Sequence, residues 1–130
     1  MYEKIKIKGM SKEQWRELRR TGIGGSDAAA VANMSPFSNP MKVFEDVMRV
    51  IMDRKVNPKE GSYTNYLFDK GIDKILKKLG EEATEIVIAA KNPNANEIKY
   101  EISDFLYHMM VLMAEKGVTW EEITTELANR

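Results

Sequence analysis

Four carboxylates stand in two pairs that share one spacing, and this spacing could create a metal site. Glu82 and Glu85 are three residues apart within GEEATE, and Glu101 and Asp104 are three residues apart within EISD. On an α-helix, residues at this spacing lie on one face, one above the other. Carboxylates gathered in one place repel one another unless cations lie between them, and Mg²⁺ is bound by such oxygens. The alternative is two solvated helix faces, because glutamate is a common helix former.

Three further polar residues adjoin these pairs. Glu97 and His108 fall at helical steps on the face of Glu101 and Asp104, so they are expected beside the ligands, in contact with a carboxylate or the substrate. A purely structural role for His108 is an equally good interpretation. Glu81 stands beside Glu82 and is either a general base or a surface charge.

The composition limits the chemistry. Cysteine is absent and there is one histidine, so any metal must be held by oxygen, which suits Mg²⁺ and also Mn²⁺. The formal net charge is +0, which gives no electrostatic case for nucleic acid or an anionic membrane. No apolar run approaches the roughly 20 residues that span a bilayer. The first ten residues, MYEKIKIKGM, are too charged for a signal peptide, so a cytoplasmic protein is expected.

The elements that must position these side chains are expected to be helices. Apolar periodicity, capping residues and turns predict five of them, over roughly residues 39–54, 63–70, 72–91, 96–116 and 120–130. Ser62 should cap the second helix, Gly117 should end the fourth, and Thr119 with Glu122 forms a capping box for the fifth. Short connections imply antiparallel neighbours, so the fold class is an all-α helical bundle built on two long antiparallel helices.

Each long helix carries an apolar stripe that is expected to face the core. On the first the stripe comprises Ile72, Ile75, Leu76, Leu79, Ala83, Ile86, Val87 and Ala90. On the second it comprises Ile98, Ile102, Phe105, Leu106, Met109, Leu112 and Met113. If the helices pack antiparallel through these stripes, the two carboxylate pairs can face each other.

From about residue 44 to the C-terminus, the chain resembles the phosphoribosyl-ATP pyrophosphohydrolases of histidine biosynthesis. The matching words are DRKVNPKEGSYTNYLFDKGIDKILKKLGEEATEIVIAAKN and YEISDFLYHMMVLMAEKGVTWEEI. That family belongs to the MazG-like all-α nucleotide pyrophosphohydrolases, with the signature E-x-x-E, a spacer, then E-x-x-D. The resemblance implies a hydrolase that converts phosphoribosyl-ATP to phosphoribosyl-AMP and pyrophosphate. A related enzyme acting on free nucleoside triphosphates is the alternative.

The resemblance also implies roles for particular residues. The metal ligands are Glu82, Glu85, Glu101 and Asp104. A carboxylate not fully committed to the metal, Glu81 or Glu82, would orient or deprotonate the attacking water. The phosphates of the nucleotide would meet basic side chains, for which the candidates are Arg54, Lys55, Lys70 and Lys74. A helical core this small gains by pairing, so a homodimer is expected.

The segment before residue 44 belongs to neither long helix and has a different resemblance. Residues 11–45, with WRELRRTGIGGSDAA and SPF, are similar to the amino-terminal motif of YqaJ-like viral recombinase exonucleases. The remaining nuclease ligands are not found, so residues 1–43 are expected to be an appended, incomplete fragment of small helices and loops. Its Arg16, Arg19 and Arg20 are the only support for a nucleic-acid-binding alternative, and an inactive fusion is a further one.

Overall fold

The computed structural model describes residues 39–130, and every regular element within that range is an α-helix. The helices are α3 (Lys42–Val56), α4 (Tyr63–Lys70), α5 (Ile72–Ala89), α6 (Ala95–Lys116) and α7 (Trp120–Ala128). The all-α prediction is therefore confirmed, although α3 begins about three residues later than predicted. Among the described helices, none is long and apolar enough to cross a membrane.

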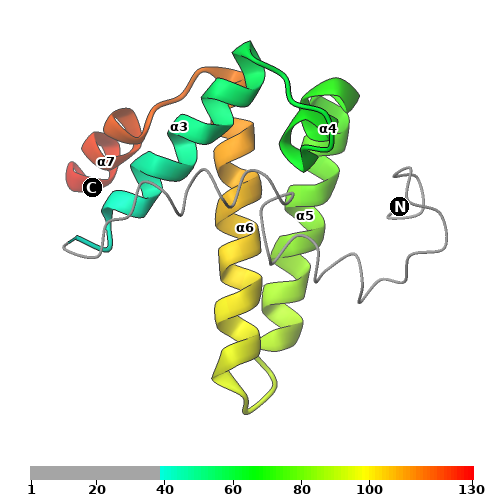
Figure 1. The fold of residues 1–130 in the computed structure, drawn as a ribbon. Coiled ribbons are helices and arrows are strands. Elements are labelled where there is room, and N and C mark those ends of the chain that lie inside the picture. The colour runs from blue at the N-terminus through cyan, green and yellow to red at the C-terminus, as the bar shows by residue number, and fades with distance from the viewer. Residues whose placement is uncertain (1–38) are drawn as a thin grey trace, which may run out of the picture.

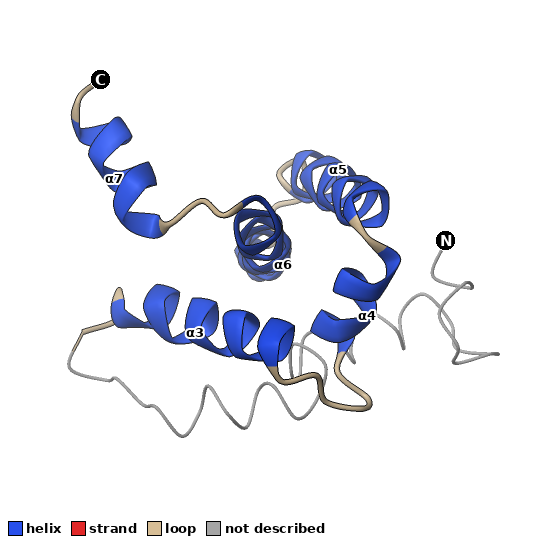
Figure 2. Ribbon diagram, turned by 90° about the horizontal axis from the view of Figure 1, so that it is seen from above, coloured by secondary structure: helices blue, strands red, loops and turns tan. Residues whose placement is uncertain are grey.

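The two long helices, α5 and α6, lie side by side and antiparallel, joined by a tight turn (Figure 1). Viewed along α6, α5 lies on one side of it, α3 crosses it on another and α7 lies on a third (Figure 2). The short helix α4 connects α3 to the start of α5 and contacts α3, α5 and α6. This arrangement is the expected bundle of antiparallel helices.

Local sequence signals fix the ends of the helices. The Ser62 side chain accepts a hydrogen bond from the Asn65 backbone N–H at the start of α4. Gly71 has φ 89°, a value that favours glycine and permits the abrupt change of direction between α4 and α5. Thr119 and Glu122 form the predicted capping box, in which each side chain bonds the other residue's backbone N–H.

The apolar core lies where α3, α4 and α6 meet. Its buried members are Val47, Ile51, Tyr63, Leu67, Ile75, Tyr107, Met110, Val111, Met113 and Ala114. Phe44 and Trp120 pack edge to face with ring centroids 5.2 Å apart, which attaches α7 to α3. Half of these residues lie on α6, and the others come from α3, α4 and, with Ile75, the start of α5.

The predicted burial of the apolar stripes of α5 and α6 is partly wrong within one chain. Leu76 and Val87 on α5 are 47% and 65% exposed, and Ile102 on α6 is 40% exposed. The helix faces turned inward instead carry Lys78 and Glu82 on α5, and Glu101 and Asp104 on α6, all of them buried. Periodicity located the stripes but could not show which face the neighbouring helices cover.

Candidate metal centre

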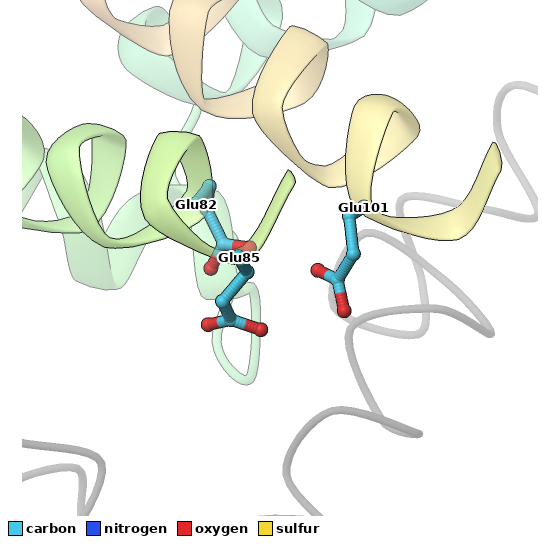
Figure 3. A group of neighbouring side chains, drawn as sticks. All are labelled: Glu82, Glu85 and Glu101. Atoms are coloured by element: carbon cyan, nitrogen blue, oxygen red, sulfur yellow. The ribbon is translucent and has the colours of Figure 1, made fainter. Parts of the chain in front are cut away.

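Three carboxylates from the two long helices converge on one point. Glu82 and Glu85 project from α5 and Glu101 from α6, to the same side of the helix pair (Figure 3). Each offers a carboxylate oxygen, and these oxygens all lie within 4.8 Å of one another. That spacing lets one divalent cation contact all three groups at the usual oxygen–metal distances of about 2.0–2.6 Å.

Burial strengthens the case for a cation at this point. Glu82 is 0% and Glu101 is 2% exposed, while Glu85 is half-buried. Ionised carboxylates removed from water are costly unless they are paired or coordinate a metal. Glu85 is partly exposed, so a ligand can approach the three carboxylates from its side of the cluster. The donor set is all oxygen, which fits Mg²⁺ and Mn²⁺.

The fourth predicted ligand, Asp104, lies one turn further along α6 and is buried on the same face as Glu101. Its carboxylate is not one of the three that meet within 4.8 Å. Its backbone carbonyl accepts a hydrogen bond of 2.8 Å from Nδ1 of His108. The structure thus places Asp104 beside the three clustered carboxylates.

A buried polar layer, formed by Tyr63 and Thr64 of α4 and by Tyr107 and His108 of α6, joins these two helices. It lies about one turn of α6 beyond Asp104. Nε2 of His108 is 3.0 Å from the Tyr63 hydroxyl, and the Thr64 hydroxyl is 2.7 Å from that of Tyr107. His108 is completely buried, with its ring edge-on to both tyrosine rings. The sequence interpretation named His108 but missed its hydroxyl partner Tyr63 and the neighbouring pair of Thr64 and Tyr107. A signal was available in SYTNY, where hydroxyl side chains crowd a helix that otherwise packs into the core.

Glu81 stands next to the cluster without belonging to it. Its Oε1 is 3.1 Å from Nζ of Lys78, and Lys78 is 1% exposed. The predicted neighbour Glu97 lies one turn before Glu101, is half-buried, and accepts a hydrogen bond of 3.2 Å from Asn92. The structure therefore places Glu97 toward the turn between α5 and α6.

The predicted phosphate-contacting residues are distributed over two regions. Lys74 is half-buried on α5, one turn before Lys78. Lys70 is exposed at the end of α4, with Nζ 5.9 Å from the ring centroid of Tyr66. Lys70 is the last residue of α4, and Lys74 lies in the first turn of α5, which follows α4 directly (Figure 1). Lys74 precedes Glu82 by eight residues, which corresponds to about 12 Å along α5.

The other two basic residues belong to the end of α3. Lys55 bonds the Ala114 carbonyl at 3.2 Å and lies 3.4 Å from Glu115, at the far end of α6. Thirteen residues of helix separate Glu101 from Ala114, which corresponds to about 20 Å. Arg54 is buried and bonds Asp53 at 3.1 Å. Within one chain, Lys55 therefore lies far from the carboxylates. Arg54 forms its ion pair at the end of α3, near the connection to α4.

The arginines Arg16, Arg19 and Arg20, together with the GIGGSD segment, lie outside the described residues. The predicted boundary between residues 43 and 44 falls inside α3, which runs from Lys42 to Val56 without a break. The predicted junction between the two segments therefore lies within a single helix.

Comparison with known proteins gives one family. The family model described as phosphoribosyl-ATP pyrophosphohydrolase matches residues 44–130. A protein of Lactiplantibacillus plantarum named phosphoribosyl-ATP pyrophosphatase is 54% identical over 90 residues, covering 69% of this chain and 85% of that protein. One of the same name from Listeria monocytogenes is 60% identical over 88 residues, covering 68% and 84%.

A third relative is a longer protein. The histidine biosynthesis bifunctional protein HisIE of Thermoanaerobacter pseudethanolicus is 59% identical over 85 residues, which is 65% of this chain but only 39% of the relative. The chain thus spans less than half the length of this relative. The residues that the family model matches include the carboxylates of the cluster.

Proposed function

The chain belongs to the phosphoribosyl-ATP pyrophosphohydrolase family, and on this premise we propose that it hydrolyses phosphoribosyl-ATP to phosphoribosyl-AMP and pyrophosphate. The reaction would serve histidine biosynthesis, for which one relative is named, and its proposed location is the cytoplasm. The observation that carries the proposal is the meeting of Glu82, Glu85 and Glu101 oxygens within 4.8 Å, in the region that the family model matches.

The metal proposed for this centre is Mg²⁺, with Mn²⁺ as a substitute. Glu82, Glu85 and Glu101 would hold it, and Asp104 would contribute from the next turn of α6. When bound, the cation supplies positive charge to the phosphate oxygens and makes a nearby water more acidic. The carboxylates supply the negative charge that selects a divalent cation and fixes it between two rigid helices.

The remaining groups of the chain bind and orient. A carboxylate not fully committed to the metal, Glu81 or Glu82, accepts the proton of the attacking water. Lys70 and Lys74 are the basic residues best placed to contact the phosphates, and Arg54 and Lys55 are less well placed within one chain. His108 helps to position Asp104 through the hydrogen bond to its backbone carbonyl. Glu97 lies one turn before Glu101 and is held by its hydrogen bond with Asn92 in the turn between α5 and α6. In phosphoryl transfer such positioning supplies most of the catalysis.

We also propose a homodimer formed through the exposed stripes of α5 and α6. Leu76 and Val87 are eleven residues apart, which is about three helical turns, so they lie on one face of α5. On α6, Ile102 is exposed and Phe105 and Met109 beside it are only half-buried. Exposed apolar surface on two adjacent helices is typical of an interface.

Pyrophosphate release tests the proposed activity. The wild-type protein should release pyrophosphate from phosphoribosyl-ATP in the presence of Mg²⁺, and not after treatment with EDTA. Glu85→Gln should reduce kcat/KM by at least about a hundredfold. Glu121→Gln, an exposed glutamate on α7, is the matched control and should retain full activity.

Two results would contradict the proposal. Higher kcat/KM with ordinary nucleoside triphosphates than with phosphoribosyl-ATP would assign the chain to the alternative substrate. Equal activity of Glu85→Gln and Glu121→Gln would remove the carboxylates from the reaction. The division into an appended segment, residues 1–43, and an enzymatic region, residues 44–130, can be tested in the same assay by removing the first segment.

A further inference from the structure

Lys78 is a buried charge that the proposed ligand set does not use. It is 1% exposed, and it is the only fully buried lysine among the described residues. An ammonium group removed from water is costly unless a negative group compensates it. Glu81 is such a compensating group, because its Oε1 lies 3.1 Å from Nζ of Lys78.

The position of Lys78 on α5 places it directly beside the metal ligands. Glu82 is four residues further along and Glu85 is seven, about one and two helical turns. All three side chains therefore share one face of α5, and neighbouring side chains on this face have Cβ atoms about 5–6 Å apart. On this face of α5, Glu82 therefore lies between Lys78 and Glu85.

We propose that Lys78 is a positioning residue that holds the Glu81 carboxylate outside the metal ligand set. This inference rests on the proposed function. Lys78 compensates one negative charge of the cluster, and its ion pair prevents Glu81 from joining Glu82, Glu85 and Glu101 as a further ligand. Glu81, rather than Glu82, is then the carboxylate left to accept a proton.

The step assigned to Glu81 balances without any other reactant. The oxygen of water forms a bond to a phosphorus of the triphosphate, the P–O bond to pyrophosphate breaks, and the Glu81 carboxylate takes the proton of the water. Glu82, in contrast, is 0% exposed and contributes an oxygen to the cluster. A carboxylate fully engaged with a cation is a weaker base than one outside its ligand set.

The test compares Lys78→Met with Lys77→Met, which removes the same charge from the exposed neighbouring position. Binding of Mn²⁺ alone is measured by calorimetry, with no nucleotide present. Loss of the Lys78 charge should strengthen Mn²⁺ binding by at least about threefold, because a positive charge near the site is removed and Glu81 becomes free to join the ligands. The same variant should lose kcat by at least about tenfold with little change in KM.

Two further variants complete a cycle. Glu81→Gln should weaken Mn²⁺ binding, because it leaves the Lys78 charge uncompensated, and the double variant Lys78→Met/Glu81→Gln should return close to the wild-type affinity. A loss of packing alone would weaken binding or leave it unchanged in Lys78→Met. The direction of the change in affinity therefore separates positioning from a structural role.

The outcomes are distinct from those that test the proposed activity. Weaker or unchanged Mn²⁺ binding by Lys78→Met overturns the inference even when the wild-type protein hydrolyses phosphoribosyl-ATP. A wild-type protein that binds no Mn²⁺ overturns both the metal centre and the role of Lys78. If Lys78→Met does not fold, the double variant decides: a folded double variant with wild-type affinity supports the ion pair, and an unfolded one overturns it.

Discussion

Replacing Tyr63 with phenylalanine should destabilise the protein, because it removes one hydroxyl from the buried layer behind Asp104. Nδ1 of His108 faces a backbone carbonyl at 2.8 Å, and a carbonyl can only accept. In the neutral ring Nδ1 therefore carries the hydrogen, and Nε2 must accept from the Tyr63 hydroxyl at 3.0 Å. Tyr63→Phe keeps the ring and its packing but leaves Nε2 without this donor.

The magnitude follows from burial. His108 is 0% exposed, so water cannot replace the missing donor. A buried acceptor left without its partner costs about 1–3 kcal/mol. For a domain of this size, each kcal/mol lost from the free energy of unfolding lowers Tm by roughly 4–8 °C. A loss of about 2 kcal/mol, in the middle of the expected range, therefore lowers Tm by about 8–16 °C.

Tyr66→Phe is the matched control on the same helix. The Tyr66 ring stacks on Tyr63 at 5.9 Å, and its hydroxyl is buried without a hydrogen-bond partner in the described part of the chain. Removing that hydroxyl should be neutral or stabilising by up to about 1 kcal/mol. Urea unfolding followed by circular dichroism measures both variants, at one fixed protein concentration because the proposed dimer would contribute to stability. If Tyr63→Phe loses no more stability than Tyr66→Phe, the assigned hydrogen bond is refuted.

Three further predictions concern the metal, the interface and alkaline pH. Mg²⁺ at one hundred times its Kd should stabilise the wild-type protein by about 2.7 kcal/mol, and Glu101→Gln should abolish that increase in thermal-shift experiments. Val87→Asp should convert the dimer to a monomer in light scattering, whereas Leu127→Asp, on exposed α7, should not. Burial raises the pKa of Tyr66 above its ordinary value of 10.0, so the unfolded chain loses this proton first and stability falls as the pH rises from about 10 through the folded pKa. Tyr66→Phe should therefore lose less stability than the wild type between pH 8 and 11 in urea titrations.

The sequence predicted the helices well because their ends depend on nearby residues. Ser62 bonds a backbone N–H three residues ahead, and Thr119 and Glu122 bond each other's backbone across the same interval. Gly117 ends α6 with φ 73°, a conformation that glycine adopts without strain. The partners in these interactions are only a few residues apart in the sequence, so no knowledge of the fold is needed to predict them.

Contacts between distant segments could not be predicted in this way. Tyr63 meets His108 across 45 positions, and Lys55 meets Ala114 across 59. In the sequence Lys55 is one of many lysines, and only packing shows that its ammonium group bonds the end of α6. The carboxylate spacing indicated a shared face on each helix, but the meeting of the two faces depended on how α5 and α6 are turned toward each other.

The orientation of α5 and α6 explains why one set of residues is buried and another exposed. A helix has a limited circumference, and the inward face of α5 is occupied by Ile75, Lys78, Glu82 and Ala89. Part of its predicted apolar stripe, with Leu76 and Val87, is consequently turned away from the core of its own chain, whereas Ile75 faces inward. Placing charged groups inside costs stability that the chain can recover only through cations, ion pairs or apolar burial elsewhere. The Lys78–Glu81 pair, the proposed metal between the carboxylates and the proposed second copy against the exposed stripes would meet these three needs, so loss of any one should make the fold more dependent on the other two.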